Sequence, residues 1–266
     1  MIDPMPEQVE QTMAERGGRR FRPTPWATAF TILGVALLIG LGTWQLQRLE
    51  WKEELIAERH TRSTDSAVPL PGDLSDSKAL DYVRVELVGR FLHDKELYLG
   101  SRTLKGSVGY HVVTPFRLSD GRTLLVNRGW VPPERRDPES RAAGQLDGGE
   151  IRIEALLRPG GWRGCGFTRP ANDPAGNLWL WPDLPAMFAA LGAEAAGLER
   201  PVTTLYAESL PVGPLAELPG GLPVAVAGAI DLRNEHLEYA LTWYALALAL
   251  LIIYLIYSTR RGAAQP

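Results

Sequence analysis

The sequence contains a single cysteine, Cys165, among 266 residues. One thiol cannot form an internal disulfide bond, and it cannot supply a zinc centre built from paired cysteines. Cys165 lies in the glycine-rich segment GGWRGCGF, with no histidine close to it in the sequence. We therefore interpret Cys165 as a structural or incidental residue rather than as a reactive thiol.

The short motifs that identify common catalytic sites are also missing. The sequence has no G-x-S-x-G, no H-E-x-x-H and no G-x-x-x-x-G-K-[ST]. We therefore expect no enzymatic activity, and a membrane-anchored hydrolase that depends on Cys165 or His111 is the least favoured alternative. The net charge of -3, without a stripe of basic residues, gives no indication of nucleic-acid binding.

What the sequence does have is two long apolar runs. Residues 26–46 and 239–257 contain no charged side chain over 21 and 19 positions. Roughly 20 apolar residues in a helix are enough to cross the hydrocarbon core of a bilayer. The first run is too long for the apolar part of a signal peptide, which has about 7–15 residues. We predict two uncleaved transmembrane helices, and the mean hydropathy of -0.09 fits two spans attached to a large water-exposed region.

The two spans divide the chain into five segments. We predict a tail at 1–25, a first span at 26–46, a middle domain at 47–236, a second span at 237–257 and a second tail at 258–266. Two spans place both termini on one side of the membrane and the middle domain on the other.

Basic residues flank both spans, and their distribution favours termini in the cytoplasm only narrowly. Six lie on the terminal sides of the spans, namely Arg16, Arg19, Arg20, Arg22, Arg260 and Arg261. Five lie toward the middle domain, namely Arg48, Lys52, Arg59, Arg62 and Arg233. Because long loops translocate despite their charge, we expect cytoplasmic termini and an extracytoplasmic, periplasmic domain.

The middle segment has the pattern of a β domain. Helical spacing continues from residue 47 to about residue 62, and a breaker-rich connection follows at 67–76. Alternating or β-branched stretches then predict strands at 82–92, 96–101, 109–118, 122–131, 150–157 and 202–209, with one short helix at 184–191. The tetrapeptide at 119–122, SDGR, is typical of a tight hairpin.

Strands at such short spacing favour an antiparallel sheet or a small barrel over a parallel βαβ arrangement. The predicted fold class is therefore membrane α+β. Two terminal transmembrane helices flank an extracytoplasmic antiparallel sheet or small barrel with a few short helices.

One histidine, His236, stands out by its position just before the second apolar run. On a helix, His236, Ala240, Trp243 and Ala247 share one face. An imidazole, an aromatic wall and two small residues suit a flat apolar ring that carries iron. The alternative is an interfacial histidine beside an aromatic belt, without any ligand.

The other three histidines are weaker candidates. His60 and His93 lie in polar stretches, where we expect them to be exposed to solvent. His111 alternates within a predicted strand, where it can fill one face of the sheet.

A second cluster lies where the first span leaves the membrane, at Trp44, Gln45, Arg48, Trp51 and Lys52. Arg48 and Lys52 are i,i+4 neighbours, so two like charges meet on one helix face at a small cost. An anionic partner removes that cost, and haem propionates and lipid phosphates are both candidates. The alternative is that both basic residues extend to the membrane interface without a specific partner.

The segment NRGWVP at residues 127–132 ends a predicted strand in a turn. Its Arg128 and Trp130 either recognise a partner or form a stacked structural pair, and the pattern alone does not separate the two.

Four segments together carry a family resemblance. They are GTWQLQRLEWK at 42–52, YVRVELVGRF at 82–91, VNRGWVP at 126–132 and NEHLEYALTWYALA at 234–247, in this order between two terminal spans. On these residues the chain resembles the Surfeit locus protein 1 family, the assembly factors of haem-copper cytochrome c oxidase. The resemblance covers nearly the whole chain beyond residue 25.

The resemblance implies a function, a location and a set of partners. It implies an assembly factor of the bacterial inner membrane that binds haem a transiently and assists its insertion into oxidase subunit I. Both termini are then cytoplasmic and the main domain periplasmic. Expected partners are subunit I, haem a synthase and membrane lipid. The alternative function is a scaffold without a cofactor that stabilises nascent subunit I.

The resemblance also implies site residues. His236, in the segment NEHLEYALTW, is the candidate axial ligand of the haem iron. To it we add Tyr239 and Trp243 as candidate pocket residues, and Trp44, Arg48 and Lys52 as a candidate edge that faces the propionates. The sequence departs from the family pattern at Tyr244, where phenylalanine is usual.

Overall fold

The computed structural model describes residues 21, 23–146, 149–192, 198–227 and 235–263. Most of the predicted N-terminal tail lies outside the described residues, and so do the basic residues Arg16, Arg19, Arg20, Arg22 and Arg233. The chain divides into two compact units, a helix pair within Met1–Leu55 and Leu232–Pro266, and a β domain within Ile56–Asp231.

The helix pair is formed by α1 (Pro25–Thr64) and α3 (His236–Ala263). Both are long and apolar enough to cross a membrane, with hydropathies of 1.8 and 2.1, and only 11% of the most apolar window of each is buried. The apolar side chains are therefore not those of a core helix in a soluble protein. As predicted, α1 continues well beyond the apolar run, and it begins at Pro25, a residue that suits the first turn of a helix.

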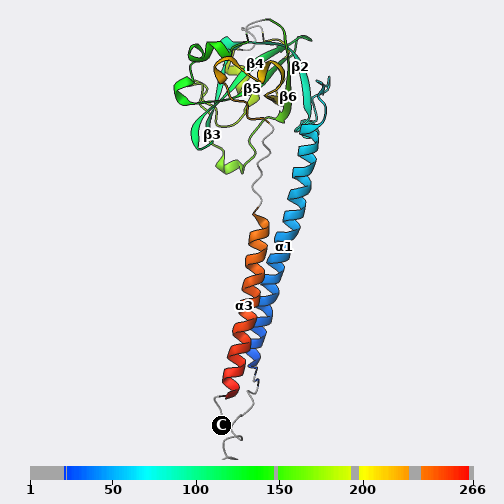
Figure 1. Ribbon diagram of the computed structural model, residues 1–266, viewed down its shortest axis with the longest axis vertical. Coiled ribbons are helices and arrows are strands. Elements are labelled where there is room, and N and C mark those ends of the chain that lie inside the picture. The colour runs from blue at the N-terminus through cyan, green and yellow to red at the C-terminus, as the bar shows by residue number, and fades with distance from the viewer. Residues whose placement is uncertain (1–20, 22, 147–148, 193–197, 228–234, 264–266) are drawn as a thin grey trace, which may run out of the picture. The chain divides into compact units, whose positions relative to one another are not determined.

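Small residues let the two helices lie side by side (Figure 1). A Cβ atom added at Gly42 would lie 2.8 Å from the ring of Tyr244, and one at Gly34 would lie 2.9 Å from Leu250. Such residues allow close approach of helices in a membrane, where packing and interhelical hydrogen bonds drive association. At the other end of the pair, the hydroxyl groups of Thr28 and Tyr254 are 2.6 Å apart.

The departure at Tyr244 has a structural role. Its hydroxyl group lies 3.2 Å from Oγ1 of Thr43, so the tyrosine adds an interhelical hydrogen bond that phenylalanine cannot make.

The β domain is a seven-stranded sheet in which five strands close into a barrel. The order is β1-β2-β6-β7-β5-β4-β3, and β4 also pairs with β2, which closes the ring. The bounds are β1 Val68–Pro69, β2 Arg84–Phe91, β3 Leu97–Leu104, β4 Ser107–Leu118, β5 Thr123–Val131, β6 Ile151–Pro159 and β7 Leu205–Ser209.

The predicted small barrel is thus confirmed, but it is not antiparallel throughout. Within the ring, β5 pairs with β7 in parallel, while the other four pairs are antiparallel. A closed ring with an odd number of strands cannot alternate direction at every step, so at least one neighbouring pair must be parallel. Outside the ring, β1 pairs with β2 in parallel, in a stretch where the sequence predicts only a connection.

Alternation along the strands builds the core. In β2, every second residue is buried, and Val85, Leu87 and Phe91 pack with Phe116 and Leu124 in one cluster. The predicted hairpin joins β4 to β5, with Gly121 at a φ of 85° that favours glycine.

A second apolar cluster lies beneath α2 (Leu184–Ala190), whose N-terminus is capped by the side chain of Asp183. Short 3₁₀ turns complete the domain at His93–Lys95, Pro133–Arg135, Pro138–Gly144, Gly166–Thr168, Gly213–Leu215 and Pro219–Gly221.

Candidate functional site

His236, the first residue of α3, forms a hydrogen bond with Gln45 of α1. The distance from His236 Nδ1 to Gln45 Oε1 is 2.7 Å. An amide oxygen only accepts hydrogen bonds, so the Nδ1 atom carries the proton and donates it. When the ring is neutral, this contact leaves the lone pair on the Nε2 atom. The ring is therefore prepared to bind a metal through Nε2.

The face of α3 that carries His236 packs within the helix pair. Ala240 and Ala247 on this face are 1% and 5% exposed, whereas Leu241 and Leu248 are 60% and 58% exposed. The two alanines therefore serve close packing of the helices, and they do not leave the open space for a ring that their small size suggests in the sequence. The same close packing brings Gln45 within reach of His236.

Two aromatic residues flank His236 on α3. His236, Tyr239 and Trp243 have i, i+3, i+7 spacing and so share one side of the helix. Tyr239 is 54% exposed and Trp243 is partly buried. An aromatic surface therefore extends from the histidine along the exposed flank of the helix.

On α1, the basic residues follow the same face as the contact with His236. Gln45, Arg48 and Lys52 have i, i+3, i+7 spacing. At 1.5 Å per residue, Arg48 and Lys52 lie about 4.5 Å and about 10.5 Å beyond Gln45 along the helix axis. The guanidinium group of Arg48 lies 3.9 Å from the ring centroid of Trp51, which holds it by a cation–π contact.

Trp44 lies one helical turn before Arg48, at i,i+4 spacing, and is 55% exposed. The structure thus brings His236 and Gln45 into direct contact. Of the other candidate residues, Tyr239 and Trp243 lie on α3, and Trp44, Arg48 and Lys52 lie on α1. Gln45 is the residue of this site that the sequence interpretation did not assign. Its position at i-3 from Arg48 was a signal, but its partner lies 191 residues away.

The other histidines lie in the β domain or beyond the apolar part of α1. His60 is exposed, as predicted. The prediction that His93 is exposed is wrong, because its side chain is only 9% exposed and contacts Arg128. His111 contacts Asn127, and burial, together with the charge of Arg102, lowers the pKa of His111 to about 4.

The barrel contains a buried ionic cluster that the sequence does not reveal. Glu96 Oε1 accepts hydrogen bonds from Arg128 at 3.3 Å and from Arg141 at 3.1 Å, and all three side chains are at most 2% exposed. Arg128 also donates to the carbonyl oxygen of Gly144 at 2.6 Å. Burial acts to raise the pKa of Glu96, but the hydrogen bonds from His93 and Arg141 and both arginine charges outweigh it and lower the pKa.

This cluster supports neither prediction for the segment NRGWVP, because the guanidinium group of Arg128 lies over the ring of Phe91, 5.0 Å from its centroid, rather than over Trp130. Arg128 is 1% exposed, and Trp130 donates from Nε1 to the carbonyl oxygen of Arg102 at 3.0 Å. Both side chains are used inside the domain, so neither forms part of a recognition surface. Within the described residues, no group of three or more histidine, cysteine, aspartate or glutamate side chains is placed to hold a metal ion.

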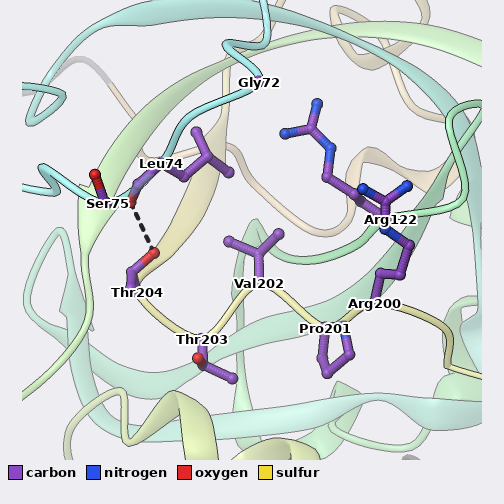
Figure 2. Close-up of a pocket in the computed structure, with 9 residues that line it drawn as sticks. All are labelled: Gly72, Leu74, Ser75, Arg122, Arg200, Pro201, Val202, Thr203 and Thr204. Carbon is purple, nitrogen blue, oxygen red and sulfur yellow. Dashed lines mark hydrogen bonds between the residues drawn. The ribbon is translucent and has the colours of Figure 1, made fainter.

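The barrel surface also has an open pocket of about 360 Å³ lined by residues 72, 74, 75, 122 and 200–204. Figure 2 shows Arg122 and Arg200 at this pocket, with the hydrogen bond from Thr204 to the carbonyl oxygen of Leu74. Arg122 forms an ion pair with Asp120 at 2.7 Å, and Arg200 donates to the carbonyl oxygen of Asp120. Both arginine side chains are therefore held by Asp120 of the hairpin. We assign no ligand to this pocket.

Comparison with known proteins identifies relatives over most of the chain. The model of the SURF1 family matches residues 32–248. Surfeit locus protein 1 of Mus musculus is 36% identical over 92% of this chain and 79% of its own length. The human protein of the same name is 35% identical over 92% of this chain and 81% of its own length. A SURF1-like protein of Monosiga brevicollis is 36% identical over 94% of this chain and 91% of its own length.

Proposed function

Because the chain belongs to the Surfeit locus protein 1 family, we propose that it is an assembly factor of haem-copper cytochrome c oxidase that carries haem a. Family membership supports a role in oxidase assembly in general. The finer proposal is that His236 holds the haem transiently and that the protein assists its insertion into subunit I.

The observation that carries the haem proposal is the hydrogen bond between His236 and Gln45. It leaves the lone pair of Nε2 available, and an imidazole nitrogen is a common axial ligand of haem iron. A carrier must release what it binds, so one histidine suits it better than two strong axial ligands. The protein supplies binding and orientation, and the proposal includes no chemical step.

The residues around His236 fit the other parts of a haem. The macrocycle is flat and apolar, and Tyr239 and Trp243 offer aromatic surface on the same side of α3. The two propionates are anionic, and Arg48 and Lys52 provide positive charge on the face of α1 that carries Gln45. Trp44 adds a large exposed ring near this edge.

The proposed location follows from the two apolar helices and the family. Both helices are long enough to cross a membrane. We place them in the bacterial inner membrane, with the termini in the cytoplasm and the barrel in the periplasm, where it meets subunit I. Haem a synthase is the proposed source of the haem, and lipid surrounds the apolar helix faces.

The single cysteine offers a direct test of this orientation. Cys165 is exposed on the β domain. A membrane-impermeant maleimide added to spheroplasts is expected to label it without permeabilisation. Labelling only after permeabilisation would place the barrel in the cytoplasm instead.

The test of the haem proposal is a visible spectrum of the full-length protein, purified in detergent after co-production with the enzymes of haem a synthesis. Wild-type protein is expected to show a haem a band that His236→Ala loses. His60→Ala is the matched control, because His60 lies exposed on α1, and it is expected to keep the band. An equal band in wild type and His236→Ala would exclude His236 as ligand.

One observation favours the alternative of a scaffold without a cofactor. Ala240 and Ala247 are buried, so the two helices themselves fill the space beside these alanines. The scaffold predicts no haem band in either protein, together with co-purification of subunit I that is unaffected by His236→Ala.

A further inference from the structure

We propose that Gln45 is the positioning residue of this site, because its amide oxygen fixes the tautomer and the ring orientation of His236. This inference rests on the proposed haem function for its consequence at the iron. Its structural part concerns only two side chains of this protein.

The contact between the two residues is held in place by the packing of the helices around it. Less than one turn from Gln45, Gly42 lies against the ring of Tyr244, and the Tyr244 hydroxyl contacts Thr43. These contacts set the register of α1 against α3 near the end of the pair where His236 begins its helix. Gln45 and His236 therefore meet in a defined geometry, at 2.7 Å.

The chemical consequence concerns the two nitrogen atoms of the imidazole ring. An acceptor at Nδ1 keeps the proton there and directs the lone pair of Nε2 away from Gln45. The acceptor also makes Nε2 a better electron donor. The charge of the acceptor determines how large this effect is. A neutral amide has a modest effect, whereas a carboxylate has a large one. A neutral acceptor suits a carrier, since it orients the ligand without strengthening the bond to iron greatly.

A purely structural role is the competing explanation. Polar side chains often hydrogen-bond across helices in a membrane and stabilise their association. In that case Gln45 substitutions would change the stability of the helix pair but not the electronic properties of a bound haem. The tautomer of His236 and the reduction potential of bound haem distinguish the two explanations, because helix association alone does not change either of them.

The first measurement needs no haem. Full-length protein with ¹⁵N-labelled histidine, reconstituted in nanodiscs, reports the protonation of each ring nitrogen by its chemical shift, and the loss of a signal in His236→Asn assigns His236. Wild type is expected to carry the proton on Nδ1 at a pH where the ring is neutral. Gln45→Leu is expected to shift the proton to Nε2, the form usual in water. Gln47→Leu is the matched control, because Gln47 is exposed on the same helix, and it is expected to match wild type.

The second measurement uses haem a as the probe. Loss of an outer hydrogen-bond partner typically weakens metal binding about 10- to 100-fold, and Gln45→Leu is expected to weaken haem binding by that factor. Gln45→Glu is expected to retain haem and to lower its reduction potential, because a carboxylate acceptor stabilises the oxidised iron through the ring. Gln47→Leu is expected to leave both quantities unchanged.

The outcomes separate this inference from the proposed function. If wild type binds haem through His236 while Gln45→Leu and Gln45→Glu leave the tautomer, affinity and potential unchanged, the positioning role is overturned. If wild type binds no haem, the proposed function fails, and the tautomer measurement alone then decides whether Gln45 orients His236.

Discussion

In the barrel, Glu96 is enclosed by Arg128 and Arg141, and none of these side chains is more than 2% exposed. In the helix pair, Arg48 is exposed and lies over the ring of Trp51. The contact between His236 and Gln45 uses only the Nδ1 atom of the imidazole ring. The barrel therefore uses its strongest polar groups to hold its own fold. The helix pair carries its polar groups where the apolar run of α1 ends and α3 begins. This difference is the reason we look for the candidate chemistry in the helices and for fold stability in the barrel.

The largest expected effect comes from breaking the buried ionic cluster. Glu96→Ala leaves two buried guanidinium groups without their carboxylate, and such a loss typically costs about 3–5 kcal/mol of unfolding free energy. We expect a strongly lowered midpoint in urea unfolding of the purified full-length protein. In the protein that remains folded, the amount of haem bound per molecule should match wild type.

Glu86→Ala is the matched control for this variant. Glu86 pairs with Arg152 on the surface, where that arginine is 66% exposed, and exposed pairs contribute about 0–1 kcal/mol. A similar loss in both variants would contradict the distinction between buried and exposed charges in the barrel.

The next effect is a pH dependence that belongs to the barrel alone. His111 has a pKa lowered to about 4 by burial and by Arg102, against an ordinary value of 6.5. Between these values the unfolded chain binds a proton that the folded protein does not, so stability is complete above pH 6.5 and falls as the pH drops toward 4. Between pH 7.5 and pH 5 the loss is about 2 kcal/mol, at 1.36 kcal/mol per pKa unit.

Thermal unfolding of wild type and His111→Gln at pH 7.5 and pH 5 measures this contribution. The variant should lose less stability on acidification than wild type. An equal loss in both proteins would assign the pH dependence to other groups.

A smaller effect on haem binding is expected from a substitution that separates α1 from α3. Gly42→Leu places a side chain where a Cβ atom already lies 2.8 Å from Tyr244. The helices must separate, which lengthens the contact between Gln45 and His236. Haem binding should weaken about tenfold, the lower end of what loss of an outer hydrogen bond causes.

Gly40→Leu provides the control within the same helix. A Cβ atom at Gly40 has no neighbour within 4 Å, so haem binding should remain at the wild-type level. Titration of both variants with haem a in detergent tests the pair, and equal affinities would show that close helix packing does not support the site.

The smallest effect concerns the basic edge. Arg48→Gln and Lys52→Gln each remove one positive charge from an exposed or half-buried position of α1, so each should weaken haem binding about two- to fivefold. The loss should shrink as salt is raised, because salt screens exposed charges. A loss that does not depend on salt would contradict a role in binding the propionates.

Much of this architecture follows from local patterns. Uninterrupted apolar residues define the spans, and alternation along β2, together with the SDGR hairpin, defines two neighbouring regions of the barrel. The helical spacing beyond residue 46 likewise predicts an extension of the first helix to about residue 62, and α1 ends at Thr64. In each case the signal lies within a few turns or one strand, because backbone periodicity decides which side chains share a face.

The errors and omissions all involve contacts between distant parts of the chain. His93 was expected to be exposed because its neighbours in sequence are polar, but it is buried by an arginine 35 residues away. Ala240 and Ala247 suggest an open space by their size, but a second helix fills it.

The sequence by itself determined the two apolar helices, most strands of the β domain, the family and the choice of His236 as the candidate ligand. Only the tertiary structure decided that the five-strand ring contains a parallel pair, that Arg128 is enclosed by Glu96 and Gly144, and that Gln45 meets His236. The physical reason is that hydrophobic periodicity is a local property of the chain. The partner of a buried charge or of an imidazole nitrogen depends instead on which distant segments pack together.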